Sequence, residues 1–414
     1  MSSRRQVHRE GLKFKKLDLH LHTPASKCFE DRAVTAEQFV EAAIAKGLHG
    51  IAVTDHNSGT WIDQIKAAAQ KTELVVFPGV EITCMGGKDG IHVIALFDVD
   101  TGTREIESLL SNLGLKPSEF GDIHTLVRQD PLAVAALIEK RGGMAVLAHA
   151  NSSKGALQDM RGEQRTALIQ CPYIRAAEAT DFQDAEAQQK HRRVIDLLDG
   201  TDPTYKRKLA VYQGSDNPTS TADGHHGVEG IGSRCSYFKL DQANLDGLCQ
   251  CFADPDVRIR QDYEYYAATY PYIRRVKIVG GFLDEAEASF HDGLNSILGG
   301  KGAGKSLLIE FLRFALDQQP QNEEILADHE SKLAHRLENY GSVEVAVVDE
   351  TGREFLITRV WDPADGHPFT SAVKNPAELF PVLFLSQNEI IKIAESHNEQ
   401  IAFIDRFFDF RSFQ

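Results

Sequence analysis

Leu17-Asp18-Leu19-His20-Leu21-His22-Thr23 is the stretch that decides the fold. Its alternation of leucine with polar residues predicts a β-strand, because successive side chains of a strand point to opposite faces. His20 and His22 would then share one face. Neutral imidazole is the commonest metal ligand in proteins, so this pair is a candidate metal site. Considered alone, the stretch fits two half-buried strand histidines without a metal equally well.

Further short apolar runs along the chain end in, or carry, groups that can bind a metal. The runs and their groups are 50–54 with Asp55 and His56, 74–80 with Glu81, 91–97 with His92, 144–148 with His149, and 209–215 with Asp216. Helical spacing between several runs predicts an α/β fold with a parallel sheet, whose strands are buried on both faces. Barrel enzymes carry their active sites at the carboxyl ends of such strands. The pattern therefore favours a barrel with a metal site at one end.

Composition limits the class of protein. With 414 residues the chain is long enough for two or three domains, and 42% hydrophobic and 25% charged residues are typical of a soluble globular protein. The formal net charge of -15 excludes a surface that is basic throughout, so nucleic-acid binding would be local. Six cysteines without a CxxC pair, and no apolar run of signal-peptide or membrane-span length, predict a cytoplasmic protein without a membrane partner.

The motif series resembles the polymerase and histidinol phosphatase (PHP) superfamily over roughly residues 14–258, in order and spacing as well as residue type. The matching motifs are DLHLHT (18–23), TDH (54–56), PGVE (78–81), His92, AHA (148–150) and GSD (214–216). The resemblance implies a distorted seven-stranded (β/α) barrel that holds two or three divalent metals and hydrolyses phosphoesters. It also implies roles: catalysis and one metal for His20, His22, Glu81 and Asp216, a second metal bridged by Glu81 and held by His92 and His149, and a third at His56.

Two departures from the family pattern concern the third metal. Where the family usually has another histidine after its first motif, this chain has Cys28, and its last motif continues as Asn217-Pro218 where the family has a histidine. Cysteine can bind zinc as a thiolate, but proline has no ligand atom, so His225 or His226 would supply the missing imidazole. The alternatives are a packed, non-ligating Cys28 and solvated loop histidines at 225 and 226.

The chemistry of phosphoester hydrolysis explains why a protein would build such a cluster. A nucleophile must form at neutral pH and the charge on the phosphoryl oxygens must be stabilised, and paired metal ions do both. Histidine ligands suit manganese, zinc or iron better than magnesium. We therefore expect a transition-metal centre.

A second motif lies at residues 299–306, where GGKGAGKS matches the P-loop pattern GxxxxGK[ST]. Glycines let backbone N–H groups wrap phosphates, and the N-terminus of the following helix adds its positive dipole end. Lys305 would reach the outer phosphates and Ser306 would ligate magnesium. The loop therefore predicts binding of ATP with magnesium, through the cradle glycines Gly299, Gly302 and Gly304.

The segments around this loop resemble the ABC and SMC ATPases. We expect a strand at 294–298, a helix at 307–316, an antiparallel hairpin of 343–348 with 354–360, and a strand at 382–385. In that class a glutamine in the place of Gln387 senses magnesium and the γ-phosphate. The Walker B segment and serine-glycine signature loop that the class also needs do not follow Gln387. We therefore expect half an ATPase, either a truncation or one part of a split protein.

Together these features predict a basic tail at 1–13, a PHP barrel at 14–258, a linker at 259–275 and the N-terminal half of an ATPase head at 276–414. The arrangement resembles the TrlF-type PHP–ATPases of bacteria, which implies a nuclease on DNA or RNA that an ATPase controls, with a role in phage defence. Expected partners are nucleic acid and a second ATPase head or the missing half, in a homo-oligomer when complete. The alternatives are a small-molecule phosphatase of the histidinol-phosphatase type and a non-catalytic platform for the ATPase.

Overall fold

The computed structural model describes residues 12–152, 155–179, 196–221, 224–261, 270–405 and 407. They divide into two compact units, Leu12–Glu264 and Tyr265–Gln414. The predicted basic tail, apart from residues 12 and 13, and the middle of the predicted linker, residues 262–269, lie outside the described residues. Among the helices that are described, none combines the length and the apolar character needed to cross a membrane.

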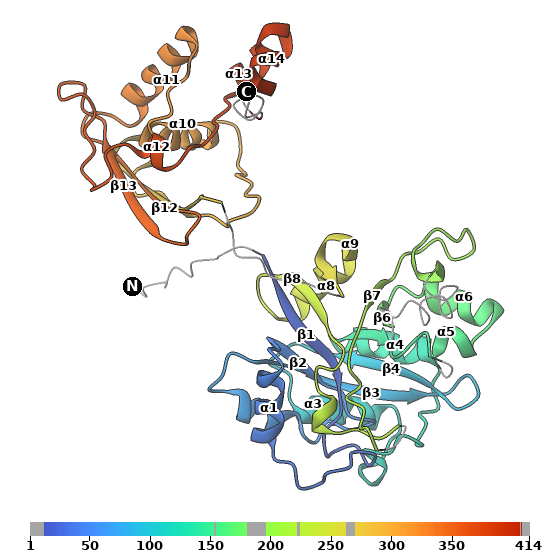
Figure 1. Ribbon diagram of the computed structural model, residues 1–414. Helices are drawn as coiled ribbons and strands as arrows, with labels where there is room; N and C mark the ends of the chain where they lie inside the picture. The colour runs from blue at the N-terminus through green and yellow to red at the C-terminus, as the bar shows by residue number, and fades with distance from the viewer. Residues whose placement is uncertain are drawn as a thin grey trace, which may run out of the picture. The chain divides into compact units, whose positions relative to one another are not determined.

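The first unit is built on one sheet that curls into a nearly closed barrel (Figure 1). Its nine strands lie in the order β7-β6-β5-β4-β3-β2-β1-β8-β9. Their bounds are β1 Lys13–Leu21, β2 Gly50–Val53, β3 Val75–Cys84, β4 Ile91–Leu96, β5 Met144–Leu147, β6 Ile174–Glu178, β7 Ala210–Tyr212, β8 Ser236–Leu240 and β9 Ile259–Arg260. The predicted α/β barrel is confirmed.

Helices connect most of these strands, and three of the helices begin at a side-chain cap. Thr35 forms a capping box with Gln38 at the start of the first helix, and Asp130 and Asn244 cap two later ones. The helices are α1 Ala36–Ala45, α2 Ile62–Ala69, α3 Thr103–Asn112, α4 Pro131–Lys140, α5 Ala156–Asp159, α6 Gly162–Gln170, α8 Leu245–Ala253 and α9 Pro255–Arg258, with single 3-10 turns η1 Pro117–Glu119 and η2 Val228–Gly230.

The sheet is mixed, so the prediction of a parallel sheet is wrong in part. Strand β4 runs antiparallel to both β3 and β5, and β8 runs antiparallel to β1. The reason is the connection between β3 and β4, residues 85–90, which holds no helix, whereas a parallel pair needs a long crossover. This hairpin places Thr83 opposite His92, so that Glu81 and His92 lie on neighbouring strands.

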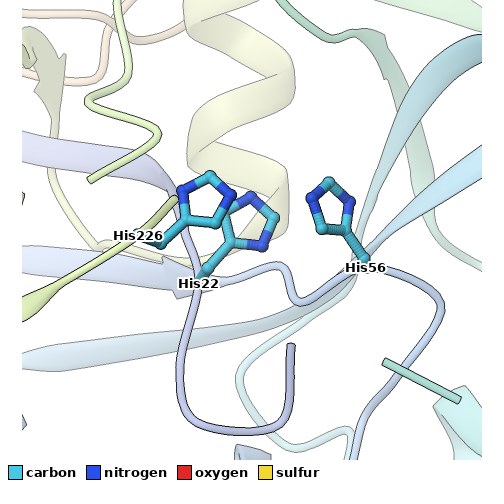
Figure 2. A group of neighbouring side chains, drawn as sticks. All are labelled: His22, His56 and His226. Atoms are coloured by element: carbon cyan, nitrogen blue, oxygen red, sulfur yellow. The ribbon is translucent and has the colours of Figure 1, made fainter. Parts of the chain in front are cut away.

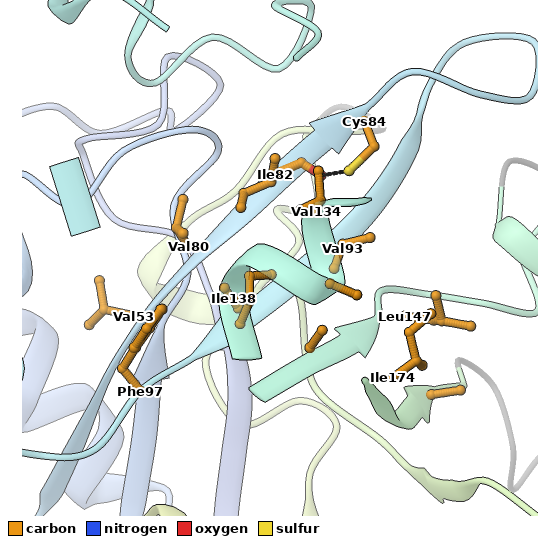
Figure 3. Close-up of a cluster of buried hydrophobic side chains, with 14 of the residues drawn as sticks. Val53, Val80, Ile82, Cys84, Val93, Phe97, Val134, Ile138, Leu147 and Ile174 are labelled. Atoms are coloured by element: carbon orange, nitrogen blue, oxygen red, sulfur yellow. Dashed lines mark hydrogen bonds between the residues drawn. The ribbon is translucent and has the colours of Figure 1, made fainter. Parts of the chain in front are cut away.

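Two apolar layers hold the strands in place. Outside the sheet, Val134 and Ile138 of α4 join the same buried cluster as Val80, Ile82 and Val93 of β3 and β4 (Figure 3). Inside the barrel, a second cluster includes Leu17, Leu19, Phe77, Tyr212 and Phe238. Burial of each such large side chain contributes about 1.5–3 kcal/mol. The strand ends that carry polar groups are thereby anchored from both sides.

The second unit is a four-stranded antiparallel sheet in the order β11-β10-β12-β13, with helices beside it. Its elements are β10 Tyr272–Val279, η3 Gly281–Leu283, β11 Glu287–Ser289, α10 Lys305–Ala315, α11 Glu323–Arg336, β12 Ser342–Val348, β13 Glu354–Val360, α12 Pro376–Leu379, α13 Gln387–Glu395 and α14 His397–Asp405. The core gathers Phe311, Leu333, Val345, Ile357 and Trp361. The predicted hairpin of β12 and β13 is confirmed.

Two strands predicted for this unit are wrong. Residues 294–298 and 382–385 form no strand. A strand needs a neighbour to satisfy its backbone groups, and among the described residues these two segments have no ladder partner. Leu294 and Leu298 are 96% and 91% exposed, so their apolar character does not place them in the core.

Candidate metal centre

Glu81 lies at the centre of a cluster of imidazoles, and its side chain is fully buried. Its Oε2 atom lies 2.8 Å from His56 Nδ1, 3.4 Å from His22 Nε2 and 3.5 Å from His20 Nε2. Its Oε1 atom lies 2.8 Å from His92 Nδ1 and 3.3 Å from His149 Nε2. The two carboxylate oxygens therefore face two different sets of nitrogen donors.

These side chains lie in or directly after separate strands of the barrel. His20 lies in β1 and His22 directly after it, Glu81 lies in β3, and a backbone bridge joins His56 to Glu81. His149 follows β5 with φ 29°, and Asp216 follows β7 with φ 56°. Left-handed backbone at non-glycine residues costs of order 1–3 kcal/mol and clusters at functional sites. The strain at these two positions supports a functional role for the strand ends.

Asp216 and His226 close the cluster on its other side. Asp216 Oδ1 lies 3.0 Å from His22 Nε2 and 3.5 Å from His20 Nε2. The ring of His226 stacks on that of His22, with centroids 4.0 Å apart, and Figure 2 shows both beside His56. His225 lies outside the cluster, half exposed, with Nδ1 3.6 Å from Glu30 Oε1. Of the two histidines considered for the missing imidazole, the structure brings in His226.

The residues present fit divalent metal ions. Three groups of donors have their ligand atoms within 4.8 Å of one another: His20 with His22 and Glu81, His56 with Glu81 and His92, and His22 with His56 and His226. His56 Nε2 and His226 Nε2 are buried without a hydrogen-bond partner. An unsatisfied buried polar atom costs about 1–3 kcal/mol, so each calls for a ligand. Imidazole and carboxylate donors suit a transition metal.

The electrostatics of the cluster keep its carboxylates ionised. Burial acts to raise the pKa of Glu81, but the imidazoles of His92, His56 and His20 hold that pKa well below its usual value. The pKa of Asp216 is likewise held well below its usual value, because His20 and His22 outweigh the effect of burial. Both carboxylates therefore carry the negative charge that a cation requires.

The P-loop occupies the turn before α10 in the second unit. Gly302 and Gly304 have φ of 82° and 89°, which side-chain-bearing residues rarely adopt. Lys305 Nζ donates to the carbonyl oxygens of Gly299 and Gly300, each at 2.7 Å, and so spans the loop. A groove of about 430 Å³ beside the loop is lined by Ser306, Lys332 and Arg336, and the positive charge of Arg336 suits phosphates.

Gln387 is the first residue of α13, after a capping box that Ser386 forms with Glu389. Its side chain is exposed. The P-loop residues and Gln387 thus lie in one unit, and the role of Gln387 stays a prediction.

Residues 18–197 match the family model of the PHP domain, and residues 275–408 match that of an AAA domain. The chain fuses a PHP domain to an AAA domain. A 5'-3' exoribonuclease of Haemophilus influenzae is 34% identical over 111 residues, which are 26% of this chain. The matched part spans 39% of that relative's length.

Solved structures similar to this chain include a lesion-specific endonuclease, PfuEndoQ from Pyrococcus furiosus, with 12% identity and a TM-score of 0.42 over 58% of this chain and 56% of that one. Another is a two-domain protein from Bacteroides vulgatus, described as containing a predicted PHP-like metal-dependent phosphoesterase. It has 14% identity and a TM-score of 0.40 over 70% of this chain and 89% of that one.

Glu178 of the PHP domain is a buried carboxylate that the sequence analysis missed. Its Oε2 accepts from His20 Nδ1 at 2.7 Å and from the backbone N–H of His149 at 2.9 Å. A carboxylate that holds the second nitrogen of a ligating histidine fixes its tautomer and orientation. Glu178 ends β6, a short strand with two alanines and an arginine that the apolar pattern did not reveal.

Two further buried aspartates brace the loops of the PHP domain. Asp55 accepts from the backbone N–H and hydroxyl of Thr23 and of Ser26. Asp18 accepts from the backbone N–H groups of Ser215 and Gly232. Both belong to quoted motifs, DLHLHT and TDH, and the available signal was a position within two residues of a proposed ligand.

Cys28 lies in the loop after β1, with its thiol beside the imidazoles of His226 and His56. Burial acts to raise the pKa of this thiol, but the two imidazoles outweigh it and lower the pKa to about 7. The structure therefore brings together every predicted metal-ligating residue of the PHP domain except His225.

Proposed function

We propose that the PHP domain is a metal-dependent nuclease in which Glu81 and the imidazoles around it would hold the divalent ions. The main support for the proposal is the geometry of Glu81. Each of its two carboxylate oxygens faces its own set of imidazoles. His20, His22 and Asp216 would hold one ion, and His92 and His149 the second. His56 would take part in a third site.

The chain's own residues supply orientation and charge. When bound, the ions would acidify a water molecule and offset charge on the phosphoryl oxygens. Glu178 holds His20 so that its Nε2 faces the cluster. Asp216, with 28% of its side chain exposed, is more accessible than Glu81, at 1%. A phosphodiester would therefore approach from the side of Asp216.

The substrate that we propose is nucleic acid, RNA in the first place. The support is the similarity of part of the chain to a curated 5'-3' exoribonuclease, at 34% identity over 111 residues. With a net charge of -15, contact with a polyanion would have to be local to the metal centre.

The AAA domain would bind ATP with magnesium and control the nuclease. The P-loop with Lys305 and Ser306 at the start of α10 supports ATP binding. By its resemblance to TrlF-type proteins, we place the protein in the bacterial cytoplasm, in phage defence, with a second ATPase segment as partner. Manganese, zinc or iron would fill the metal centre.

The test is cleavage of labelled oligonucleotides by the manganese-loaded protein and by its His20→Ala and His22→Ala variants. Each substitution removes a donor beside Glu81 Oε2, so we expect cleavage to be abolished. His225→Ala is the matched control, because its side chain lies outside the cluster, and should cleave normally. The panel should contain single-stranded RNA, single-stranded DNA and phosphomonoesters such as histidinol phosphate.

Undiminished cleavage by His20→Ala would refute the metal assignment. Turnover of phosphomonoesters alone would replace the nuclease with a small-molecule phosphatase.

A further inference from the structure

Ser26 lies in the loop after β1, and its hydroxyl contacts the imidazole of His22. Its Oγ atom lies 3.1 Å from His22 Nδ1 and 2.6 Å from Asp55 Oδ1, and the backbone N–H of His56 donates to it at 3.1 Å. These four residues are at most 2% exposed. The hydroxyl therefore has three protein partners in a place that bulk water does not reach.

Asp55 decides the direction in which the hydroxyl of Ser26 points. Its Oδ1 atom accepts from the backbone N–H groups of Thr23 and Ser26, at 2.7 and 3.1 Å, and its Oδ2 atom accepts from the hydroxyl of Thr23 at 2.6 Å. Since Oδ1 already accepts from two backbone N–H groups, it carries no proton and can only accept from Ser26 as well. Ser26 therefore donates its hydroxyl proton to Asp55.

The remaining capacity of the Ser26 hydroxyl fixes the proton of His22. A hydroxyl has one proton to donate and two lone pairs with which to accept. With the proton directed to Asp55, the lone pairs are left for the backbone N–H of His56 and for His22 Nδ1. Nδ1 is therefore the nitrogen that donates, and the Nε2 atom of a neutral His22 ring is free to bind a metal.

The Nε2 atom of His22 faces the centre of the cluster. It lies 3.4 Å from Glu81 Oε2 and 3.0 Å from Asp216 Oδ1. The Nε2 atoms of His20 and His22 are 3.2 Å apart, so the two nitrogens converge. The tautomer that Ser26 selects is thus the one that presents a lone pair at this point.

The two histidines of the first motif are held in different ways. Glu178 contacts Nδ1 of His20 directly. His22 Nδ1 instead reaches the carboxylate of Asp55 through the hydroxyl of Ser26. The two ligands therefore depend on different supporting residues, and of the pair only His22 depends on Ser26.

We propose that Ser26 is a positioning residue of the metal centre: with Asp55 behind it, its hydroxyl fixes the tautomer in which His22 binds an ion through Nε2. A hydrogen-bond partner on the second nitrogen orients a ligating histidine and raises its basicity. The inference rests on the metal centre of the proposed function and adds a residue that acts on one of its ligands.

Nitrogen NMR tests the tautomer directly. In the full-length, zinc-loaded protein with isotope-labelled histidine, His22 should carry its proton on Nδ1 and bind the metal through Nε2. The signals of His22 are those that His22→Gln removes. A proton on Nε2 of His22 would overturn the inference.

Ser26→Ala removes the acceptor for His22 Nδ1. We expect zinc affinity to fall about 10-fold in competition with a chelator, and the Nδ1 proton signal of His22 to change. Thr23→Val is the matched control, because it removes a hydroxyl bond of the same length, 2.6 Å, to the same carboxylate. In the described part of the chain no hydrogen bond joins the Thr23 hydroxyl to an imidazole.

Both variants lose a buried hydrogen bond to Asp55, so their melting temperatures should fall to a similar extent, whereas only Ser26→Ala should lose zinc affinity. Equal affinities of the two variants would reduce Ser26 to a structural role and overturn the inference. The expected tautomer and affinities without any cleavage would overturn the proposed nuclease alone. Cleavage together with an unchanged zinc affinity of Ser26→Ala would overturn the role of Ser26 alone.

Discussion

Glu178 is fully buried, and its Oε2 atom contacts both His20 and the backbone N–H of His149. Glu178→Gln keeps a hydrogen-bond acceptor for His20 but removes the charge that supports the ligand. Loss of such a partner costs about 10–100-fold in metal affinity. We expect a loss of this size in competition with a chelator, with the fold retained.

Glu139→Gln is a suitable comparison for this change, since Glu139 pairs with Arg175 on the surface and should leave metal affinity unaltered. Equal affinities for Glu178→Gln and the unsubstituted protein would show that Glu178 has no positioning role.

His56 links metal uptake to pH. Burial acts to lower its pKa, but Glu81 outweighs burial and raises the pKa to about 10, so the ring of the metal-free protein is protonated at pH 7. A metal must displace that proton, so the free state binds more protons than the loaded state. Affinity should therefore rise with pH up to about 10, with proton release.

Calorimetric titration at pH 7 in two buffers of different ionisation enthalpy measures this release. Binding enthalpies that do not depend on the buffer would contradict it.

At the scale of elements, the sequence predicted a strand correctly where a buried apolar run carries or precedes a side chain that can bind a metal. The strands that carry or precede His20, His56, Glu81, His92 and Asp216 lie where the apolar runs predicted them. Strand β6 was missed because five residues with two alanines give a weak signal. The antiparallel direction of β4 was not predicted, because the direction of a strand depends on the connection before it, which the side-chain pattern does not show.

The same limit explains why a strand was wrongly predicted at 294–298. It also explains why the sequence did not decide between His225 and His226. Pairing between strands, and the approach of a loop from far along the chain, are tertiary effects that local periodicity cannot show. His226 enters the cluster through backbone bonds to Cys28 and Glu30. Nothing in the stretch TADGHHG separates it from His225.

The P-loop and α10 form the element on which the proposed ATP binding depends. Lys305→Ala removes the ammonium group that would meet the outer phosphates. A hydrogen bond to a charged group is worth about 1.5–3 kcal/mol, so we expect ATP affinity to fall about 10- to 100-fold. Fluorescence titration with a labelled ATP analogue measures it.

Lys301→Ala, an exposed lysine of the same loop at a variable position of the motif, should bind ATP normally. We also expect negligible turnover by the chain alone. Steady hydrolysis that Lys305→Ala abolishes would show that the ATPase site is complete.

At the scale of the whole molecule, the two compact units should give separate unfolding transitions, and bound metal should affect only the transition of the PHP domain. A ligand at 100 times its dissociation constant stabilises the unit that binds it by about 2.7 kcal/mol. Chelation should therefore lower the melting temperature of the PHP domain, while the unit with the P-loop, which lacks this cluster, should melt as before. Scanning calorimetry with and without chelator checks this, and equal shifts of both transitions would contradict it.

The contacts that close the barrel join residues far apart in the sequence, so they also affect when the site can form during synthesis. The backbone N–H of His22 donates to Asn217, 195 positions later, and Cys28 meets His226 across a similar span. Contacts of such sequence separation form late and slowly. A nascent chain that has not yet reached residue 226 lacks the last donors, however much of the barrel has emerged. Synthesis itself would thus postpone metal loading until residue 226 has left the ribosome.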